Sequence, residues 1–413
     1  MTTIQRPRRF AAAILTLVPL CSACRADVRA SSTIVTTMDT IGGVVHVRNA
    51  GAPRAGSLTE RVRLGSAGLE TTDSNQVFGR IAGVVADANG RIYIADANAH
   101  QIRVFDEGGA FLHRFGSEGA GPGEVRALQS IGIMGDTLAV LDWGNARLGL
   151  FSTDGEWLDH RQYMALSGSG IRLHMTGSHE LYMPFVGAVG EQRGLLFVRQ
   201  TPGGARDTLS ASLHVGAPAA TTMRERASAL AVLCRHSAGR GISLYSADLA
   251  PSAIVVPAPD ALRAAASGAE YSIAFVDAAG DTVRVIERDL ASGPLNDEEW
   301  ADEQRRFQEF LDQFDDESCE PRTLPRPPVR RMLLSIFFDD AGRTWVERET
   351  ATGRVFDVFD GAGRLLAELE APQRLDRVPP YVRDGRLYLV VTDSLDVEYV
   401  NAFDVNGVTE LPR

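Results

Sequence analysis

A repeat of about 46 residues constrains the fold of this chain more than any other feature of its sequence. When residues 83–116 are shifted by about 46 positions, they align with a second segment in a single register. Each unit consists of short apolar runs separated by Asp-Gly or Asn-Gly turns, a pattern typical of antiparallel strands joined by hairpins. Four short strands in about 46 residues is the size of one β-propeller blade. The matched pairs include Ile92/Leu138, Asp96/Asp142 and Phe105/Phe151.

Weaker copies of this unit continue to the C-terminus. They comprise a third at 180–198, a fourth at 242–277, a fifth at 340–365 and a sixth at 384–404. An early strand at 61–64 is predicted to complete the last blade, because an open ring would leave a sheet edge unpaired at the seam. The sequence therefore predicts an all-β fold, a six-bladed β-propeller spanning residues 58–413.

Two segments carry a resemblance to a known family. Residues 86–106 resemble an NHL repeat, and 115–125 is similar to the segment that joins blades in bacterial six-bladed propellers of the NHL-repeat or TolB-like type. The resemblance is strong over 78–160, moderate over 332–408 and weak between them. It implies the propeller fold, whereas propellers host many unrelated activities.

Residues 294–331 interrupt the strand pattern. They contain a run of helix formers with one apolar stripe, and Asn296 and Glu299 form a capping-box-like start. Residues 296–320 hold eleven Asp/Glu and two Arg. We expect a helical insertion that packs its stripe on the flank of the propeller; the alternative is a lid, or partner docking through an acidic helix at 296–317. The stripe consists of Trp300, Phe307, Phe310, Leu311 and Phe314.

The first 24 residues have the features of an export signal. Three arginines precede a short apolar run at 10–20, which is too short to span a bilayer. Ser22-Ala23-Cys24 resembles the end of a bacterial lipobox, although Cys21 stands where Leu is usual. The alternatives are an outer-membrane lipoprotein anchored through Cys24 and simple secretion to the periplasm or beyond. Residues 25–57 are predicted to form a linker or N-terminal extension.

Composition excludes several functions. All 42 cationic residues are arginines, so lysine Schiff-base chemistry and a Walker-type phosphate loop are excluded. The net charge of −11 argues against nucleic acid as a partner, and a lipid anchor is the one expected link to a membrane. Beyond Cys24 the remaining cysteines are Cys234 and Cys319, which either form a disulfide in an oxidising compartment or remain free thiols.

Candidate metal ligands are scattered. The divergent middle of the chain contains His174, His179, His214 and His236, without the spacing of a metal motif. NHL-type amidating lyases hold zinc with histidines of several blades, and gluconolactonase-type propellers hold calcium with carboxylate and Asn ligands. Asp96, Asn98, Asp142 and Asn145 have suitable chemistry, but such residues more often cap turns between strands.

The loops at 96–100 and 142–147 are expected to share one face of the ring. Trp143, beside polar groups, is either an aromatic platform for a peptide or saccharide or part of the core. We therefore expect a non-catalytic module that binds a protein, peptide or glycan and needs no cofactor. The alternative is a hydrolase or lyase using calcium or zinc at the channel mouth. The candidate ligand-binding residues are Asp96, Asn98, His100, Asp142, Trp143, Asn145 and Arg147.

Overall fold

The computed structural model describes residues 34–408 apart from several gaps. The chain divides into two units, 1–31 and 32–413, and the first lies outside the described residues, as do Cys24 and the predicted signal. None of the described helices is long and apolar enough to cross a membrane. The gaps are 67–72, 163–171, 177–179, 190–191, 201–205, 211–230, 236–241, 315–318, 321, 351 and 373–377.

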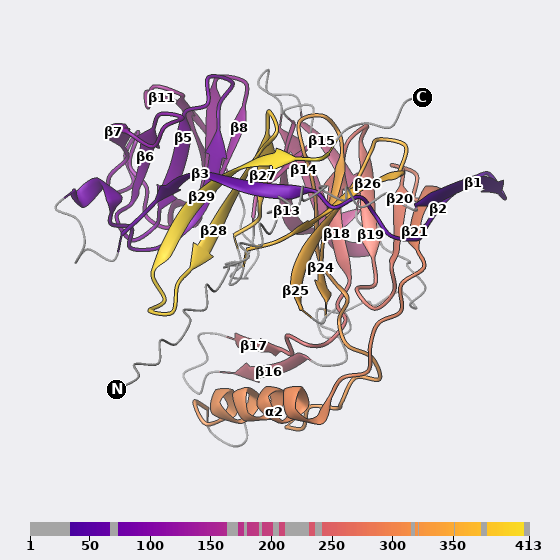
Figure 1. Ribbon diagram of the computed structural model, residues 1–413. Helices are drawn as coiled ribbons and strands as arrows, with labels where there is room; N and C mark the ends of the chain where they lie inside the picture. The colour runs from indigo at the N-terminus through magenta and orange to yellow at the C-terminus, as the bar shows by residue number, and fades with distance from the viewer. Residues whose placement is uncertain are drawn as a thin grey trace, which may run out of the picture. The chain divides into compact units, whose positions relative to one another are not determined.

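The second unit is a six-bladed β-propeller, as predicted (Figure 1). In blades one to five the four blade strands are antiparallel neighbours in chain order. Blade one is β4 (Ile81–Ala86), β5 (Ile92–Asp96), β6 (Gln101–Phe105) and β7 (Phe111–Phe115). Blade two is β8 (Leu128–Met134), β9 (Thr137–Asp142), β10 (Arg147–Ser152) and β11 (Trp157–Gln162). Blade three is β12 (His174–Thr176), β13 (Glu180–Val189), β14 (Gln192–Gln200) and β15 (Arg206–Ser210).

The remaining blades complete the ring. Blade four is β18 (Ile254–Ala258), β19 (Leu262–Ala266), β20 (Ser272–Val276) and β21 (Thr282–Arg288). Blade five is β23 (Leu333–Phe338), β24 (Thr344–Thr350), β25 (Gly353–Phe359) and β26 (Leu365–Glu370). Blade six is β27 (Tyr381–Arg383), β28 (Arg386–Thr392), β29 (Glu398–Asn406) and β3 (Ser57–Leu64).

The ring closes through the early strand, which confirms the prediction for residues 61–64. The N-terminal β3 pairs antiparallel with the C-terminal β29, with Leu64 opposite Val400 and Ser57 opposite Asn406. In Figure 1 the indigo β3 runs beside the yellow β29. Blade six is therefore built from both ends of the propeller sequence, and β29 is paired on both sides.

A recurring Asp-x-x-Gly-Arg turn explains why the strands end where they do. Asp87 Oδ1 accepts hydrogen bonds from the backbone N–H groups of Asn89 and Arg91, both at 2.9 Å, and Gly90 has φ +77°. Only glycine adopts such a φ without strain, so the turn needs it there. The Arg91 guanidinium then pairs with the same carboxylate at 2.7 Å. The turns at 339–343 and 360–364 repeat these bonds.

The core lies between neighbouring blades. Apolar side chains from blades one and two form one cluster, and those from blades six and one form another, which also includes residues of β3. The largest fully buried side chains include Trp345, Tyr93, Tyr182 and Tyr388. Burying a large side chain stabilises the fold by about 1.5–3 kcal/mol, and these interfaces repeat around the ring.

An N-terminal hairpin extends blade four to six strands. It consists of β1 (Val35–Ile41) and β2 (Val44–Ala50), and β2 pairs in parallel with β21. The buried side chain of Asn49 links the hairpin to blade five, because it donates to the Gly363 carbonyl at 3.0 Å and accepts from the Leu365 N–H at 2.9 Å. These strands fall inside the segment predicted to precede the propeller.

A small module outside the blades holds the helical insertion. It consists of the sheet β17 (Ile242–Ser246), β16 (Ala231–Arg235) and β22 (Cys319–Glu320), together with α2 (Asp297–Leu311). We call this module the cap. The predicted capping box between Asn296 and Glu299 is present. The assignment of 242–245 to the fourth blade was wrong, because β17 pairs with β16 while blade four consists of β18–β21.

The predicted packing partner of the helix was also wrong in part. The apolar stripe of α2 is buried as expected, but it contacts Tyr245, Leu249 and the cysteines of the cap rather than a blade flank. Two of its rings, Phe307 and Phe310, lie 5.1 and 5.2 Å from Tyr245. The small sheet of the cap covers the stripe, because the apolar residues of α2 have no blade flank to pack on.

Candidate functional site

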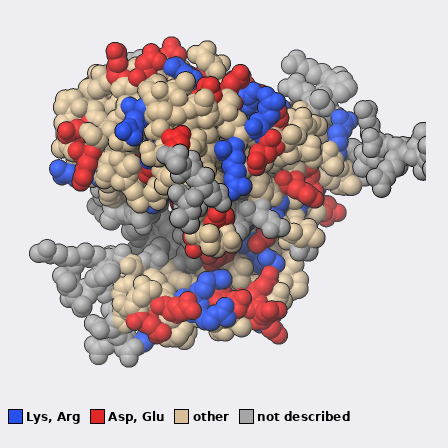
Figure 2. Space-filling view, turned by 60° about the vertical axis from the view of Figure 1, so that its left-hand side comes forward, with Lys and Arg blue, Asp and Glu red and all other residues tan. Residues whose placement is uncertain are grey.

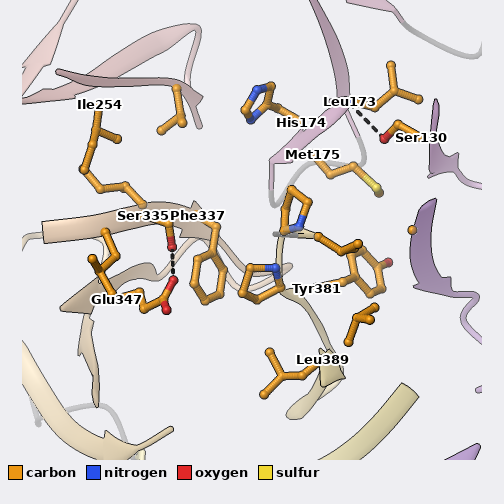
Figure 3. A pocket seen from close by; sticks show the side chains of 18 of the residues that line it. Ser130, Leu173, His174, Met175, Ile254, Ser335, Phe337, Glu347, Tyr381 and Leu389 are labelled. Atoms are coloured by element: carbon orange, nitrogen blue, oxygen red, sulfur yellow. Dashed lines mark hydrogen bonds between the residues drawn. The ribbon is translucent and has the colours of Figure 1, made fainter. Parts of the chain in front are cut away.

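The main cavity lies along the inner strands of the propeller. Its volume is about 680 Å³, within the usual range for ligand pockets of about 300–1,000 Å³. All six innermost strands contribute to it: β4, β8, β12, β18, β23 and β27. Figure 3 shows side chains from these strands, among them Ile254, Phe337 and Tyr381, around the same space. Val, Leu and Ile side chains form one part of its lining, which we call the aliphatic wall, and charged and polar side chains are interspersed with them, so the cavity suits a ligand with both apolar and polar groups.

A gap in blade six widens this cavity. The inner strand β27 begins only at Tyr381, after Val378 and two prolines, Pro379 and Pro380. Proline lacks the N–H group that a strand ladder needs, so pairing cannot extend upstream. Side chains of the second strand, Leu389 and Val390, therefore line the cavity directly.

Polar groups interrupt the apolar wall at defined points. Ser335 Oγ donates to Glu347 at 2.8 Å (Figure 3). Arg354 pairs with the same carboxylate at 3.1 Å. Across the cavity, Ser130 Oγ accepts from the Leu173 N–H at 3.1 Å. Glu347 is buried, so its two partners compensate the cost of removing the carboxylate from water.

The cap lies at one end of the channel. Because strands alternate in direction, the connections between blades meet at the same end as the hairpins between second and third strands. The cap is built from two such connections, residues 231–249 between blades three and four and 289–331 between blades four and five. A disulfide between Cys234 and Cys319 joins them. Figure 2 shows acidic and arginine side chains intermingled on the lower part of the molecule, at the height of α2 in Figure 1.

Charged residues of the cap reach the cavity. Three charged side chains line it: Asp248 from the segment that leads into β18, Arg306 from α2, and Arg331 from the segment that leads into β23. Arg306 pairs with the fully buried Glu303 at 2.6 Å, and Glu303 also accepts a hydrogen bond from Tyr245 at 2.5 Å. The cavity therefore has an apolar wall and one ionic end.

His174 brings a titratable ring to the cavity wall. Its ring lies 5.6 Å from Phe197, edge to face. Burial lowers the pKa of His174 from 6.5 to about 4, since the low-dielectric surroundings disfavour the imidazolium. The ring is therefore neutral at pH 7 and offers one donor and one acceptor.

The predicted residues of the first loop are used within the fold. Asp96 is fully buried, accepts from the backbone of Gly79 and Ala99 at 3.2 Å, and pairs with Arg103 at 2.9 Å. Asn98 is exposed, and His100 is half-buried with φ +54°. The carboxylate of Asp96 thus fixes the corner between β5 and β6.

The second loop is arranged in the same way. Asp142 is buried, accepts from two backbone N–H groups at 3.1 Å, and receives a bond from Asn145 at 2.6 Å. Arg147 lies 3.3 Å from Asp142 and donates to the carbonyls of residues 120, 121 and 124. Trp143 is half-buried against the cluster of Leu141 and Leu148. None of these residues lines the cavity, and ligand binding at either loop stays a prediction.

The described residues provide no cluster of side chains for the metal-dependent alternative. Within the described ranges no group of three or more His, Cys, Asp or Glu side chains has the arrangement of a metal site. His174 lies in the cavity, whereas His179, His214 and His236 lie outside the described residues. Zinc or calcium at the channel mouth therefore remains an untested alternative.

Sequence reasoning missed the residues that form the cavity. Its polar end comes from Arg331 and Asp248, which belong to the connections between blades rather than to the repeat. The Pro379-Pro380 pair was the available signal, because two prolines at the start of an inner strand indicate a shortened strand. The other signal was the pair of arginines at 330 and 331, which follows a Pro-rich segment.

One comparison with known protein families supports the fold. The model of the DUF5128 family, described as a six-bladed β-propeller, matches residues 40–171. No curated protein matches the chain. A DUF4221 family member from Bacteroides vulgatus is 12% identical with TM-score 0.46 over 86% of this chain and 99% of its own. Virginiamycin B lyase from Staphylococcus aureus is 10% identical with TM-score 0.37 over 83% and 98%. Likeness at this level says nothing about activity.

Proposed function

We propose that the protein is an exported, non-catalytic binding module that takes a peptide segment into the cavity beneath the cap. The observation that carries the proposal is the cavity of about 680 Å³ enclosed by all six inner strands and the cap. Export is supported by the basic and apolar run over residues 1–24.

The backbone around the channel favours a peptide. The innermost strand of each blade is the edge of its sheet and pairs on one side. Part of its other side is already bonded, since Arg172 donates to the carbonyls of Ala82 and Gln129; the backbone groups that have no such partner can bond to the main chain of an extended ligand. A peptide also supplies apolar side chains for the aliphatic wall.

A glycan fits the same wall less well. Saccharides are bound by flat aromatic rings together with amide and carboxylate groups; the described lining has three carboxylates but no Trp, Asn or Gln, and Glu347 is already paired. The hydroxyl of Tyr381 already donates to the Ala86 carbonyl at 3.1 Å. The predicted platform, Trp143, packs on a core cluster outside the cavity.

The test is to fill the cavity and measure peptide binding. The probe is a pool of N-acetylated tetrapeptides of Ala, Leu, Val and Phe with free C-terminal carboxylates, assayed by equilibrium dialysis and mass spectrometry. Ile254→Trp, at the first position of β18 in the cavity wall, should abolish retention of the pool. Leu158→Trp is the matched control, because Leu158 is 52% exposed on an outer strand.

Two outcomes contradict the proposal. One is an unmodified protein that retains no peptide. The other is equal retention by Ile254→Trp and by the control. Thermal midpoints of all three proteins show whether the indole has disturbed the fold, and Leu334→Trp, on the neighbouring β23, provides a second filled cavity.

A further inference from the structure

Arg331 occupies a fixed position between the cap and the blades. It immediately precedes β23, and its backbone N–H donates to the Leu249 carbonyl at 2.9 Å. This bond ties the two connections that enter blades four and five. The side chain of Arg331 lines the cavity at the end where the cap meets the apolar wall.

The guanidinium of Arg331 has no partner among the described residues. Its Nε is buried without a hydrogen bond, and no carboxylate of the described chain lies within 4 Å of its side chain. Burial lowers its pKa, although Asp248 and Glu349 oppose that effect. Buried donors in native proteins nearly always have a partner, so an unpaired one facing a cavity points to a ligand.

The other arginines of the cavity and one neighbouring carboxylate are already paired. Arg306 and Arg354, the other arginines of the cavity, pair with Glu303 and Glu347. Glu349 pairs with Arg330 at 2.9 Å. Arg331 is therefore the cation of the cavity that remains free to bind an anion.

We infer that Arg331 binds the C-terminal carboxylate of the peptide, an inference that rests on the proposed function. A guanidinium presents a planar fork of N–H donors that matches a carboxylate in a bidentate manner. With its terminus at Arg331, an extended peptide has its preceding side chains along the aliphatic wall. The cap end thus selects the chain terminus, and the wall accepts apolar side chains.

The experiment compares matched peptide pools and matched arginine variants. The tetrapeptide pool is prepared with free and with amidated C-termini. For the unmodified protein, we expect the free acids to bind at least about tenfold more tightly than the amides, as a charge-assisted hydrogen bond requires. Arg331→Gln should remove that preference, and Arg331→Lys should retain part of it.

Arg305→Gln is the control, because it removes the same charge from the cap at a residue that does not line the cavity and that pairs with Asp302 on the exposed side of α2. It should preserve the preference for free acids to within about twofold, the scatter expected of an exposed ion pair. Equal binding of acids and amides by the unmodified protein overturns the role of Arg331 and leaves the proposed function standing. An equal loss of both pools in Arg331→Gln also overturns it, since that result marks a structural role. Failure of both pools to bind the unmodified protein overturns both proposals.

Discussion

The disulfide between Cys234 and Cys319 should stabilise the whole ring and not the cap alone. The two cysteines are 85 residues apart, and the loop between them contains all four strands of blade four. In the loop-entropy model, closing a loop of that length removes conformational freedom worth about 4–5 kcal/mol from the unfolded chain, and typical measured effects are about 2–4 kcal/mol. Loss of the disulfide should therefore lower the free energy of unfolding by about 2–4 kcal/mol.

The assay is urea unfolding of the chain from residue 25 on, so that Cys21 and Cys24 are absent. Both bonded cysteines are buried, so Cys234→Ala/Cys319→Ala changes little surface charge or polarity. With a slope of about 3 kcal/mol per M, the upper end for ordinary domains, the unfolding midpoint should fall by about 1 M. Dithiothreitol should shift the unmodified protein by the same amount and leave the double variant unchanged. Coincident midpoints for oxidised protein and double variant would refute the reasoning, because the loop would then not limit the unfolded chain.

Three further predictions concern single side chains. Burial lowers the pKa of His174 to about 4, so between pH 6.5 and 4 the unfolded chain binds a proton that the folded protein does not. The free energy of unfolding therefore falls as the pH is lowered from 6.5 to 4. Urea titrations at these two pH values should show a smaller fall for His174→Gln than for the unmodified protein. Asp96→Asn leaves the buried Arg103 without its anion and should cost about 3–5 kcal/mol, against under about 0.5 kcal/mol for Asp281→Asn at an exposed turn, with peptide binding in the channel unaffected. Cys24→Ala should release the protein from membrane fractions, and unchanged fractionation would count against a lipid anchor.

The repeat was enough to predict the ring. The pattern of each blade is local: apolar strands, turn residues and one Asp at the end of the second strand, as at Asp96 and Asp142. Each of these blades satisfies the pattern with its own residues. Ring closure by residues 61–64 could be predicted too, because an unpaired sheet edge is costly wherever it occurs. The capping box at Asn296 is another local pattern, and the structure contains it.

The cavity could not be predicted in the same way. It is formed by residues from six blades and two insertions, and the sequence pattern carries no record of which side chains meet there. Suitable ligand chemistry drew attention to Asp96 and Asp142, which the structure uses to hold corners of the blades. Arg331 lies outside every repeat, and its unpaired state becomes visible only when the positions of Glu347, Glu349 and Asp248 around it are known.

Closure of the ring by β3 has a consequence for the order of folding. Residues 57–64 are synthesised more than 300 residues before their partner strand at 398–406. Until that strand has been made, β3 exposes a strand edge and blade six is incomplete, so the nascent chain carries an aggregation-prone edge over that interval. Contacts of such long sequence separation also slow folding. Truncation before residue 398 would remove one strand by sequence but two from the sheet, since β3 would lose its neighbour in blade six.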